Sequence, residues 1–242
     1  MNHSDIDTVT RKQALIDELE TSIKLIKSGL REIQAIDGEN DFYHILLLTL
    51  ANGFERLMKV IICLYMYERD GVFPTKYPWD KNRNGHNLVF LLNYVAENCF
   101  YQKYVEKLPV AKSDIDYIKN NPKLAKHVEI LSGFGKAARY YNLDVIKGCK
   151  PETSSPKEEW IKLEKEIIRE NPDWRKEIQN DPNLNLNYKR VNKEIVIIFE
   201  RFARSLSRLF TIGRLGDYAK QISGNVYPFL MLMDDSLGEN SY

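Results

Sequence analysis

Apolar side chains recur three or four residues apart along residues 16–64, and this spacing constrains the fold more than any other feature of the chain. The first series is Ile16, Leu19, Ile23, Ile26, Leu30 and Ile33. The second series is Leu47, Leu50, Phe54, Leu57, Ile61 and Leu64. Each series places its side chains along one side of a helix. We therefore expect helices near residues 8–36 and 41–69, packed antiparallel as the base of a bundle.

The same spacing continues after residue 85 and predicts further helices near 88–95, 123–146 and 188–211. Gly133 and Gly135 lie inside the second of these helices. Each glycine weakens a helix by about 1 kcal/mol relative to alanine, so we expect them to mark a close contact between helices. The pattern as a whole predicts an all-α fold, an antiparallel helical bundle.

The segments between these helices are less regular. Residues 72–85 contain two prolines, and we expect no regular structure there. Residues 148–187 are charged and predict a helical insertion before the last long helix. The tail after Gly213 should dock in part, while its last eight or so residues fray. We therefore expect a single domain, made of a core, an insertion, and a final core helix with its tail, at residues 1–147, 148–187 and 188–242.

Composition favours a soluble globular protein. The chain has 242 residues, of which 43% are hydrophobic and 29% are charged, and its net charge is +1. Attraction to nucleic acid would therefore need a local basic patch. Cys63, Cys99 and Cys149 are far apart and lack partners at metal-ligand spacing, so we expect neither a metal nor another cofactor. The start of the chain does not read as a signal peptide, and the apolar runs are too short to span a bilayer, which predicts a cytoplasmic protein without membrane contact.

Two polar motifs interrupt the apolar pattern. Glu55, Leu57 and Lys59 give the helical motif E-x-L-x-K, within NGFERLMKVIICLYMYE. The segment GHNLVFLLNYV then places Gly85 and His86 at the start of the next helix. This pair of motifs resembles the HEPN families, small helical bundles common in prokaryotic toxin, defence and nucleotide-linked systems. The resemblance covers roughly residues 10–147.

HEPN ribonucleases carry an Arg and a His four to six residues apart on a late helix, where the Arg binds the RNA phosphate and the His moves a proton. By order, Arg139 corresponds to that Arg, but the following residues are Tyr140, Tyr141, Asn142, Leu143 and Asp144. An ionised aspartate cannot take over the acid role of a histidine without a large shift of its pKa. We therefore expect a non-catalytic binding or assembly module that contacts RNA or a nucleotide. The alternative is a divergent metal-independent endoribonuclease that uses Arg139 and His86.

Each candidate ligand-binding residue also has a structural interpretation. Glu55 and Lys59 have the spacing of a routine helical ion pair, worth a few tenths of a kcal/mol, and Arg56 could belong to a solvated face. His86 could cap the helix or hold a neighbouring helix in place. Arg139 could pair with Asp144 or Glu55. The functional interpretation places all of these residues around a phosphate or a base, together with Tyr140, Tyr141 and Asn142.

The final helix is the only part of the chain with a clear basic bias. Residues 187–214 contain seven Lys or Arg against two Glu, and Arg201, Arg204 and Arg208 form one stripe. This stripe could track phosphates, or it could pair with the acidic insertion, and we favour pairing. The resemblance also implies a homodimer or a partner protein. Apolar residues cover more than one side of the final helix and would suit such an interface: Ile195, Ile198, Phe199, Phe202 and Phe210.

Overall fold

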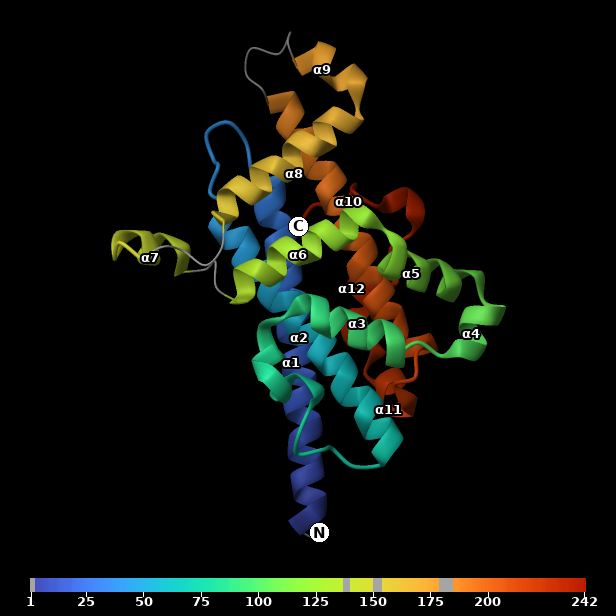
Figure 1. Cartoon of the computed structure of the whole chain (residues 1–242). Coiled ribbons are helices and arrows are strands. Elements are labelled where there is room, and N and C mark those ends of the chain that lie inside the picture. The colour runs from blue at the N-terminus through green and yellow to red at the C-terminus, as the bar shows by residue number, and fades with distance from the viewer. Residues whose placement is uncertain (1–2, 137–139, 150–153, 179–184) are drawn as a thin grey trace.

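The computed structural model describes residues 3–136, 140–149, 154–178 and 185–242, and their regular structure is helical (Figure 1). The predicted all-α bundle is confirmed within these ranges. One isolated antiparallel bridge joins Phe100 to Gly213. The helices that build the core are α1 (His3–Gln34), α2 (Tyr43–Asp70), α3 (Leu88–Asn98), α5 (Pro109–Asn120), α6 (Pro122–Lys136), α8 (Pro156–Glu170) and α10 (Asn185–Ile212). The shorter helices are α4 (Gln102–Lys107), α7 (Tyr141–Ile146), α9 (Pro172–Ile178), α11 (Gly216–Gln221) and α12 (Tyr227–Leu230).

The base of the bundle is the antiparallel pair α1 and α2, as the two apolar series predicted (Figure 1). Two glycines let these helices approach closely. A Cβ added at Gly53 would lie 2.9 Å from the backbone nitrogen of Ile26, and one added at Gly29 would lie 2.5 Å from Cγ of Leu50. Because any larger residue would push the helices apart, the glycines set the closeness of this contact.

Helices α3, α6, α8 and α10 complete the core over α2. The insertion therefore contributes to the bundle, since its helix α8 buries Trp160, Leu163 and Ile167 in the shared core. Helix α7 projects to one side of the molecule (Figure 1). Within the described residues, no helix is long and apolar enough to cross a bilayer.

Two local expectations are wrong. The proline-containing segment expected to be irregular forms a 3₁₀ helix over Pro78–His86, because Pro78 takes the first helical position, where its missing N–H costs nothing. The single helix expected over 123–146 is divided, since α6 ends at Lys136 and α7 begins at Tyr141. Tyr140, which precedes α7, has backbone angles outside the α-helical region.

The tail does not fray. The buried carboxylate of Glu200 on α10 accepts hydrogen bonds from the backbone N–H of Gly238 at 2.6 Å, from the amide of Asn240 at 3.0 Å and from the hydroxyl of Tyr242 at 2.5 Å. Gln34 on α1 donates to the carbonyl of Asn240 and accepts from the N–H of Tyr242. The end of the described chain is thereby fastened to both α1 and α10.

The apolar surface that suggested a homodimer lies inside this one chain. The five side chains cited for it are at most 7% exposed: Ile195, Ile198, Phe199, Phe202 and Phe210. They face α2, α5, α6, α8 and the tail, which together surround α10. Helix α10 therefore offers none of these residues to a second copy.

Candidate functional site

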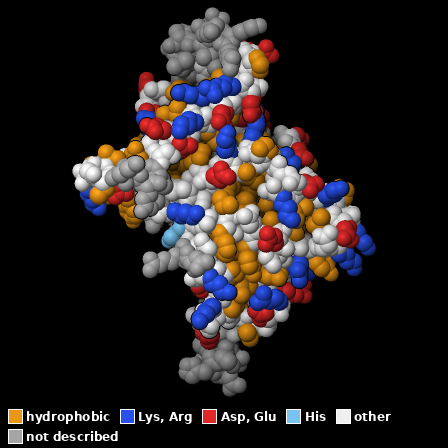
Figure 2. Space-filling model, viewed as in Figure 1, with side chains coloured by type: hydrophobic (Ala, Val, Ile, Leu, Met, Phe, Trp, Pro, Cys, Tyr) orange, Lys and Arg blue, Asp and Glu red, His pale blue; other side chains and the backbone are white. Residues whose placement is uncertain are grey.

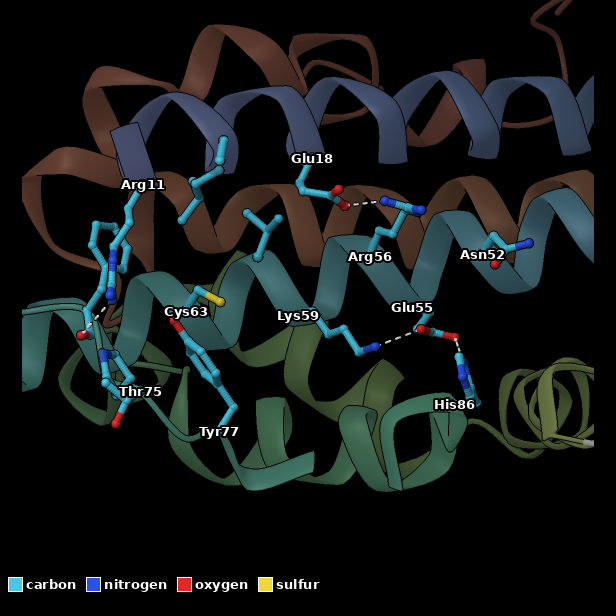
Figure 3. Close-up of a pocket in the computed structure, with 15 residues that line it drawn as sticks. Arg11, Glu18, Asn52, Glu55, Arg56, Lys59, Cys63, Thr75, Tyr77 and His86 are labelled. Atoms are coloured by element: carbon cyan, nitrogen blue, oxygen red, sulfur yellow. Dashed lines mark hydrogen bonds and ion pairs between the residues drawn. The ribbon is translucent and has the colours of Figure 1, made fainter. Parts of the chain in front are cut away.

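A pocket with a volume of about 740 Å³ lies between α1, α2 and residues 73–77 (Figure 3). We call it the α1–α2 pocket. Its charged and polar lining includes Glu55, Arg56, Lys59 and His86, so both sequence motifs contribute to one cavity. The remaining lining residues are Arg11, Ala14, Leu15, Glu18, Asn52, Val60, Cys63, Phe73, Pro74, Thr75 and Tyr77.

Glu55 is the centre of the polar group. Its side chain is 10% exposed, and its two carboxylate oxygens bind different partners. Oε1 accepts from Lys59 Nζ at 2.7 Å, and Oε2 lies 3.0 Å from His86 Nδ1. Figure 3 shows Lys59 and His86 on opposite sides of this carboxylate. The predicted ion pair between Glu55 and Lys59 is confirmed, and the same carboxylate also holds the imidazole, which is 52% exposed.

The start of α3 fixes where His86 lies. Asn87, not His86, caps this helix, because its side-chain oxygen accepts from the N–H of Phe90 at 3.1 Å. The hydroxyl of Ser132 on α6 accepts from the N–H of Leu88 at 3.1 Å and donates to Asn87. His86 therefore holds neighbouring elements together through Glu55. The close helix contacts expected at the two glycines of α6 are not seen, because a Cβ added at Gly135 would lie an ordinary 3.4 Å from the carbonyl oxygen of His86 and one added at Gly133 would meet no atom within 4 Å.

Helix α1 supplies a wall that the sequence motifs did not reveal. Arg56 on α2 pairs with Glu18 on α1 across the pocket, where both side chains are half-exposed (Figure 3). Arg11 binds Asp7 at 3.0 Å and donates to the carbonyl of Phe73 at 3.2 Å, which ties the following loop to α1. In the sequence, Arg11 and Glu18 are seven residues apart, which places them on the same side of a helix, beside the apolar series. This spacing could have identified them as neighbours in the site.

The far end of the pocket is aromatic and carries a thiol. Tyr77 stacks on Trp79 with ring centroids 4.6 Å apart, and Lys59 Nζ lies 5.6 Å from the Trp79 ring. Burial raises the pKa of the Cys63 thiol to about 11, although its hydrogen bond with Tyr77 lowers it in part. The thiol is therefore protonated at neutral pH and is a poor nucleophile.

The second group of sequence candidates does not join this pocket. Arg139 lies outside the described residues. Tyr140 and Tyr141 lie at the start of α7, and Asn142 lies within α7. In the part of the chain that the structure describes, these three residues are not among those that line the α1–α2 pocket. The sequence predicted that these residues and the motif residues Glu55, Arg56, Lys59 and His86 surround one ligand. For the described residues, that arrangement is not seen.

The basic stripe of α10 is mostly engaged in internal contacts. Arg204 is 4% exposed and binds Asp234 at 2.5 Å and the carbonyl of Leu232 at 3.0 Å. Arg208 binds the buried Asp114 at 3.0 Å. The favoured pairing is therefore seen: the partners of Arg204 and Arg208 lie on the tail and α5, and Arg190 of the same helix pairs with Glu177 of the insertion. Arg201 lies over the ring of Tyr117, 4.3 Å from its centroid.

The charged surface agrees with this internal pairing. On the face drawn in Figure 2, Lys and Arg side chains alternate with Asp and Glu and form no continuous basic patch. Among the described residues, no three His, Cys, Asp or Glu side chains are placed to hold a metal ion. No protein-family model, curated protein or solved structure matches the chain, so the site is interpreted from its own geometry.

Proposed function

We propose that the chain is a non-catalytic HEPN-like module that binds an anionic ligand, RNA or a nucleotide, in the α1–α2 pocket. The observation that carries this proposal is the convergence of Arg56, Lys59 and His86 on one cavity. These residues come from the two motifs that resemble the HEPN families. The resemblance also suggests a prokaryotic defence or toxin–antitoxin setting and a cytoplasmic location.

The charges of the pocket support a ligand with a single phosphate. Three cations line it, Arg11, Arg56 and Lys59, against the two carboxylates of Glu18 and Glu55. An exposed ion pair such as Arg56 with Glu18 contributes only about 0–1 kcal/mol, so a phosphate can replace Glu18 at little cost. The more buried Glu55 stays with Lys59 and His86 and keeps them in place.

The shape and apolar lining support a base or sugar beside that phosphate. The volume of about 740 Å³ lies within the range of small-molecule sites, roughly 300–1,000 Å³. Val60, Phe73 and Tyr77 supply the apolar part of the lining. One cation whose carboxylate partner can be displaced, together with an apolar wall, suits a nucleotide unit better than a metal or a fully charged ligand.

Binding of fluorescently labelled AMP and of a labelled ten-nucleotide RNA, measured by anisotropy, tests the proposal. We expect saturable binding that Arg56→Ala weakens at least tenfold. The control is Arg31→Ala, which changes an exposed arginine of α1 outside the pocket and should leave the affinity unchanged. If neither probe binds, or if the two variants behave alike, the α1–α2 pocket is not the binding site.

A second candidate function is metal-independent RNA cleavage. The contact between Glu55 and His86 favours it, because a carboxylate on Nδ1 of an imidazole leaves Nε2 available to accept a proton. A mixed RNA pool incubated with the protein in EDTA decides between the two functions. We expect the RNA to stay intact. Cleavage that is lost in both His86→Ala and Arg139→Ala would establish the ribonuclease instead.

Assembly is a separate part of the proposal. We propose a homodimer or a complex with a partner protein, as the HEPN resemblance implies. Helix α7 supports such a contact, because it projects from the bundle and exposes Leu143, Val145 and Ile146. Light scattering at micromolar concentration should give a dimer mass, and Ile146→Glu should reduce it to that of the monomer. A monomeric wild-type protein would contradict self-association.

A further inference from the structure

A second pocket, of about 340 Å³, lies near the C-terminal end of α2. It combines tyrosines with charged side chains: Tyr65, Glu68, Tyr101, Tyr104, Arg214 and Lys220. We call it the Arg214 pocket. Its α2 residues lie on a different side of that helix from the α1–α2 pocket, since Tyr65 follows Cys63 by two residues and residues at that separation point in nearly opposite directions.

The backbone around Arg214 is held in place. The N–H of Arg214 donates to the carbonyl of Cys99 at 2.8 Å, and the neighbouring residues Phe100 and Gly213 form the antiparallel bridge. These contacts join the segment after α3 to the segment after α10. The exposed Tyr101, at the start of α4, and Arg214 thereby line the same pocket from two segments that backbone contacts hold together.

Arg214 and Glu68 differ from the other charged residues of this pocket. Arg69 is paired with Asp70 at 2.6 Å, and Lys220 is paired with Asp217 at 2.8 Å. Among the described residues, neither Arg214 nor Glu68 forms an ion pair or a side-chain hydrogen bond. The Arg214 guanidinium lies 5.5 Å from the centroid of the Tyr65 ring. An unpaired cation and an unpaired anion thus line one small cavity.

Glu68 is kept beside the backbone of α11. A Cβ added at Gly216, which has φ of +79°, would lie 1.9 Å from Oε2 of Glu68. A side chain at position 216 would displace this flexible, exposed carboxylate, and the position also needs the left-handed backbone that glycine adopts easily. The carboxylate forms no ion pair in the described structure, although beside Asp217 it helps to raise the pKa of Lys220 in the same pocket.

We propose that the Arg214 pocket binds a guanine nucleotide unit. Arg214 would bind the phosphate, for which a planar guanidinium is well suited. The exposed ring of Tyr101 would stack on the base, as aromatic side chains do with nucleic-acid bases. Glu68 would accept two adjacent N–H donors of guanine, an edge that adenine and uracil lack. The volume, near the lower limit of small-molecule sites, fits one nucleotide and not a longer strand.

Calorimetric titration with GMP, UMP, guanosine and inorganic phosphate tests this site. We expect GMP to bind at least tenfold more tightly than UMP. Arg214→Gln should weaken GMP at least tenfold and leave guanosine unchanged, whereas Glu68→Gln should remove the preference for GMP over UMP. The matched control is Arg201→Gln, because that arginine also belongs to the basic segment and also lies over a tyrosine. It should leave GMP binding unchanged.

Two results would overturn the inference. The first is the absence of GMP binding, or GMP binding that Arg214→Gln does not alter in a variant with unchanged circular dichroism. The second is a complete loss of GMP binding in Arg56→Ala, because GMP bound in the Arg214 pocket should remain when the α1–α2 pocket is impaired. The two sites can fail separately, since each has its own arginine variant. A further comparison uses a pentanucleotide that ends in guanosine monophosphate. If it binds as tightly as GMP, the ligand is the end of a strand. If GMP binds tenfold more tightly, the ligand is the free nucleotide.

Discussion

Oε2 of Glu55 lies 3.0 Å from Nδ1 of His86, although 31 residues separate them in the chain. The contact crosses from α2 to the end of the 3₁₀ helix, and Lys59 binds the other oxygen of the same carboxylate. Glu55 therefore does more than form a local helical pair. It connects the two sequence motifs and gives the α1–α2 pocket its fixed edge.

This connection predicts energetic coupling between the two residues. In a double-mutant cycle of Glu55→Ala and His86→Ala, the coupling free energy should be about 0.5–2 kcal/mol, because the residues share a hydrogen bond at a mostly buried carboxylate. Urea unfolding measures it. The half-exposed pair of Glu18 and Arg56 serves as the comparison and should couple by no more than about 1 kcal/mol. Strictly additive effects of Glu55 and His86 would show that their contact contributes nothing.

Two glycine substitutions should have opposite effects on stability. Gly53→Ala places a Cβ 2.9 Å from the backbone of α1, so we expect a loss of about 1–3 kcal/mol in the free energy of unfolding. Gly133→Ala meets no atom within 4 Å and should add about 0.5–1 kcal/mol through better helix propensity. Thermal or urea unfolding compares the two variants. Stabilisation by Gly53→Ala would mean that α1 and α2 are less tightly packed than described.

His127 should make the fold sensitive to acid. The ring is fully buried, Nδ1 donates to the carbonyl of Lys123 at 2.7 Å, and Nε2 has no partner. Burial lowers the pKa of His127 from 6.5 to about 4. Between these values the unfolded chain binds a proton that the folded chain does not. Stability should therefore fall as the pH drops from 6.5 to 4, by on the order of 3 kcal/mol from this residue.

The comparison with His127→Leu isolates that effect. Burial raises the pKa of Glu164 from 4.5 to about 7, so the contribution of Glu164 has the opposite sign: it is fully present below pH 4.5 and is lost as the pH rises through 7. The two contributions largely cancel in the wild type between pH 7 and pH 4.5, so the unfolding free energy should rise more on going from pH 7 to pH 4.5 in His127→Leu than in the wild type. Equal differences in both proteins would rule out a role for His127.

The tail should depend on Glu200. Glu200→Gln removes one acceptor oxygen from a carboxylate that receives three hydrogen bonds, and we expect a loss of about 2 kcal/mol. Hydrogen exchange at residues 238–242 should become faster. Lys193→Ala provides the control, because it removes only an exposed ion pair with Glu239 and should cost no more than about 1 kcal/mol. Unchanged exchange in Glu200→Gln would show that other contacts hold the tail.

The parts of the fold that the sequence predicted well are those that local spacing determines. The paired helices α1 and α2 follow from side chains three and four residues apart. The docking of the tail could not be predicted in this way, because it depends on Glu200 meeting residues about 40 positions later. The division of residues 123–146 into α6 and α7 likewise could not be predicted, because the apolar spacing continues through the whole segment.

In the candidate site, too, the residues set by local sequence motifs were predicted, and those brought in by the packing of distant segments were not. The motif residues Glu55, Lys59 and His86 were identified from the sequence, and the structure brings them together. Arg11 and Glu18 were missed, because only the antiparallel packing of α1 on α2 brings them to the pocket. The pattern of charges on α10 also did not show that the partner of Arg208 would be Asp114, 94 residues earlier.

The pairing of charges inside the α1–α2 pocket has a consequence for its response to ionic strength. Each lining cation already faces a carboxylate, so a bound phosphate would exchange one internal partner for another and add little net charge neutralisation. The logarithm of the binding constant falls with the logarithm of salt concentration by about 0.9 for each phosphate neutralised on duplex DNA. The slope for this pocket should therefore not exceed that of one phosphate contact, so the pocket would retain a small ligand at salt concentrations that remove long polyanions from the protein surface.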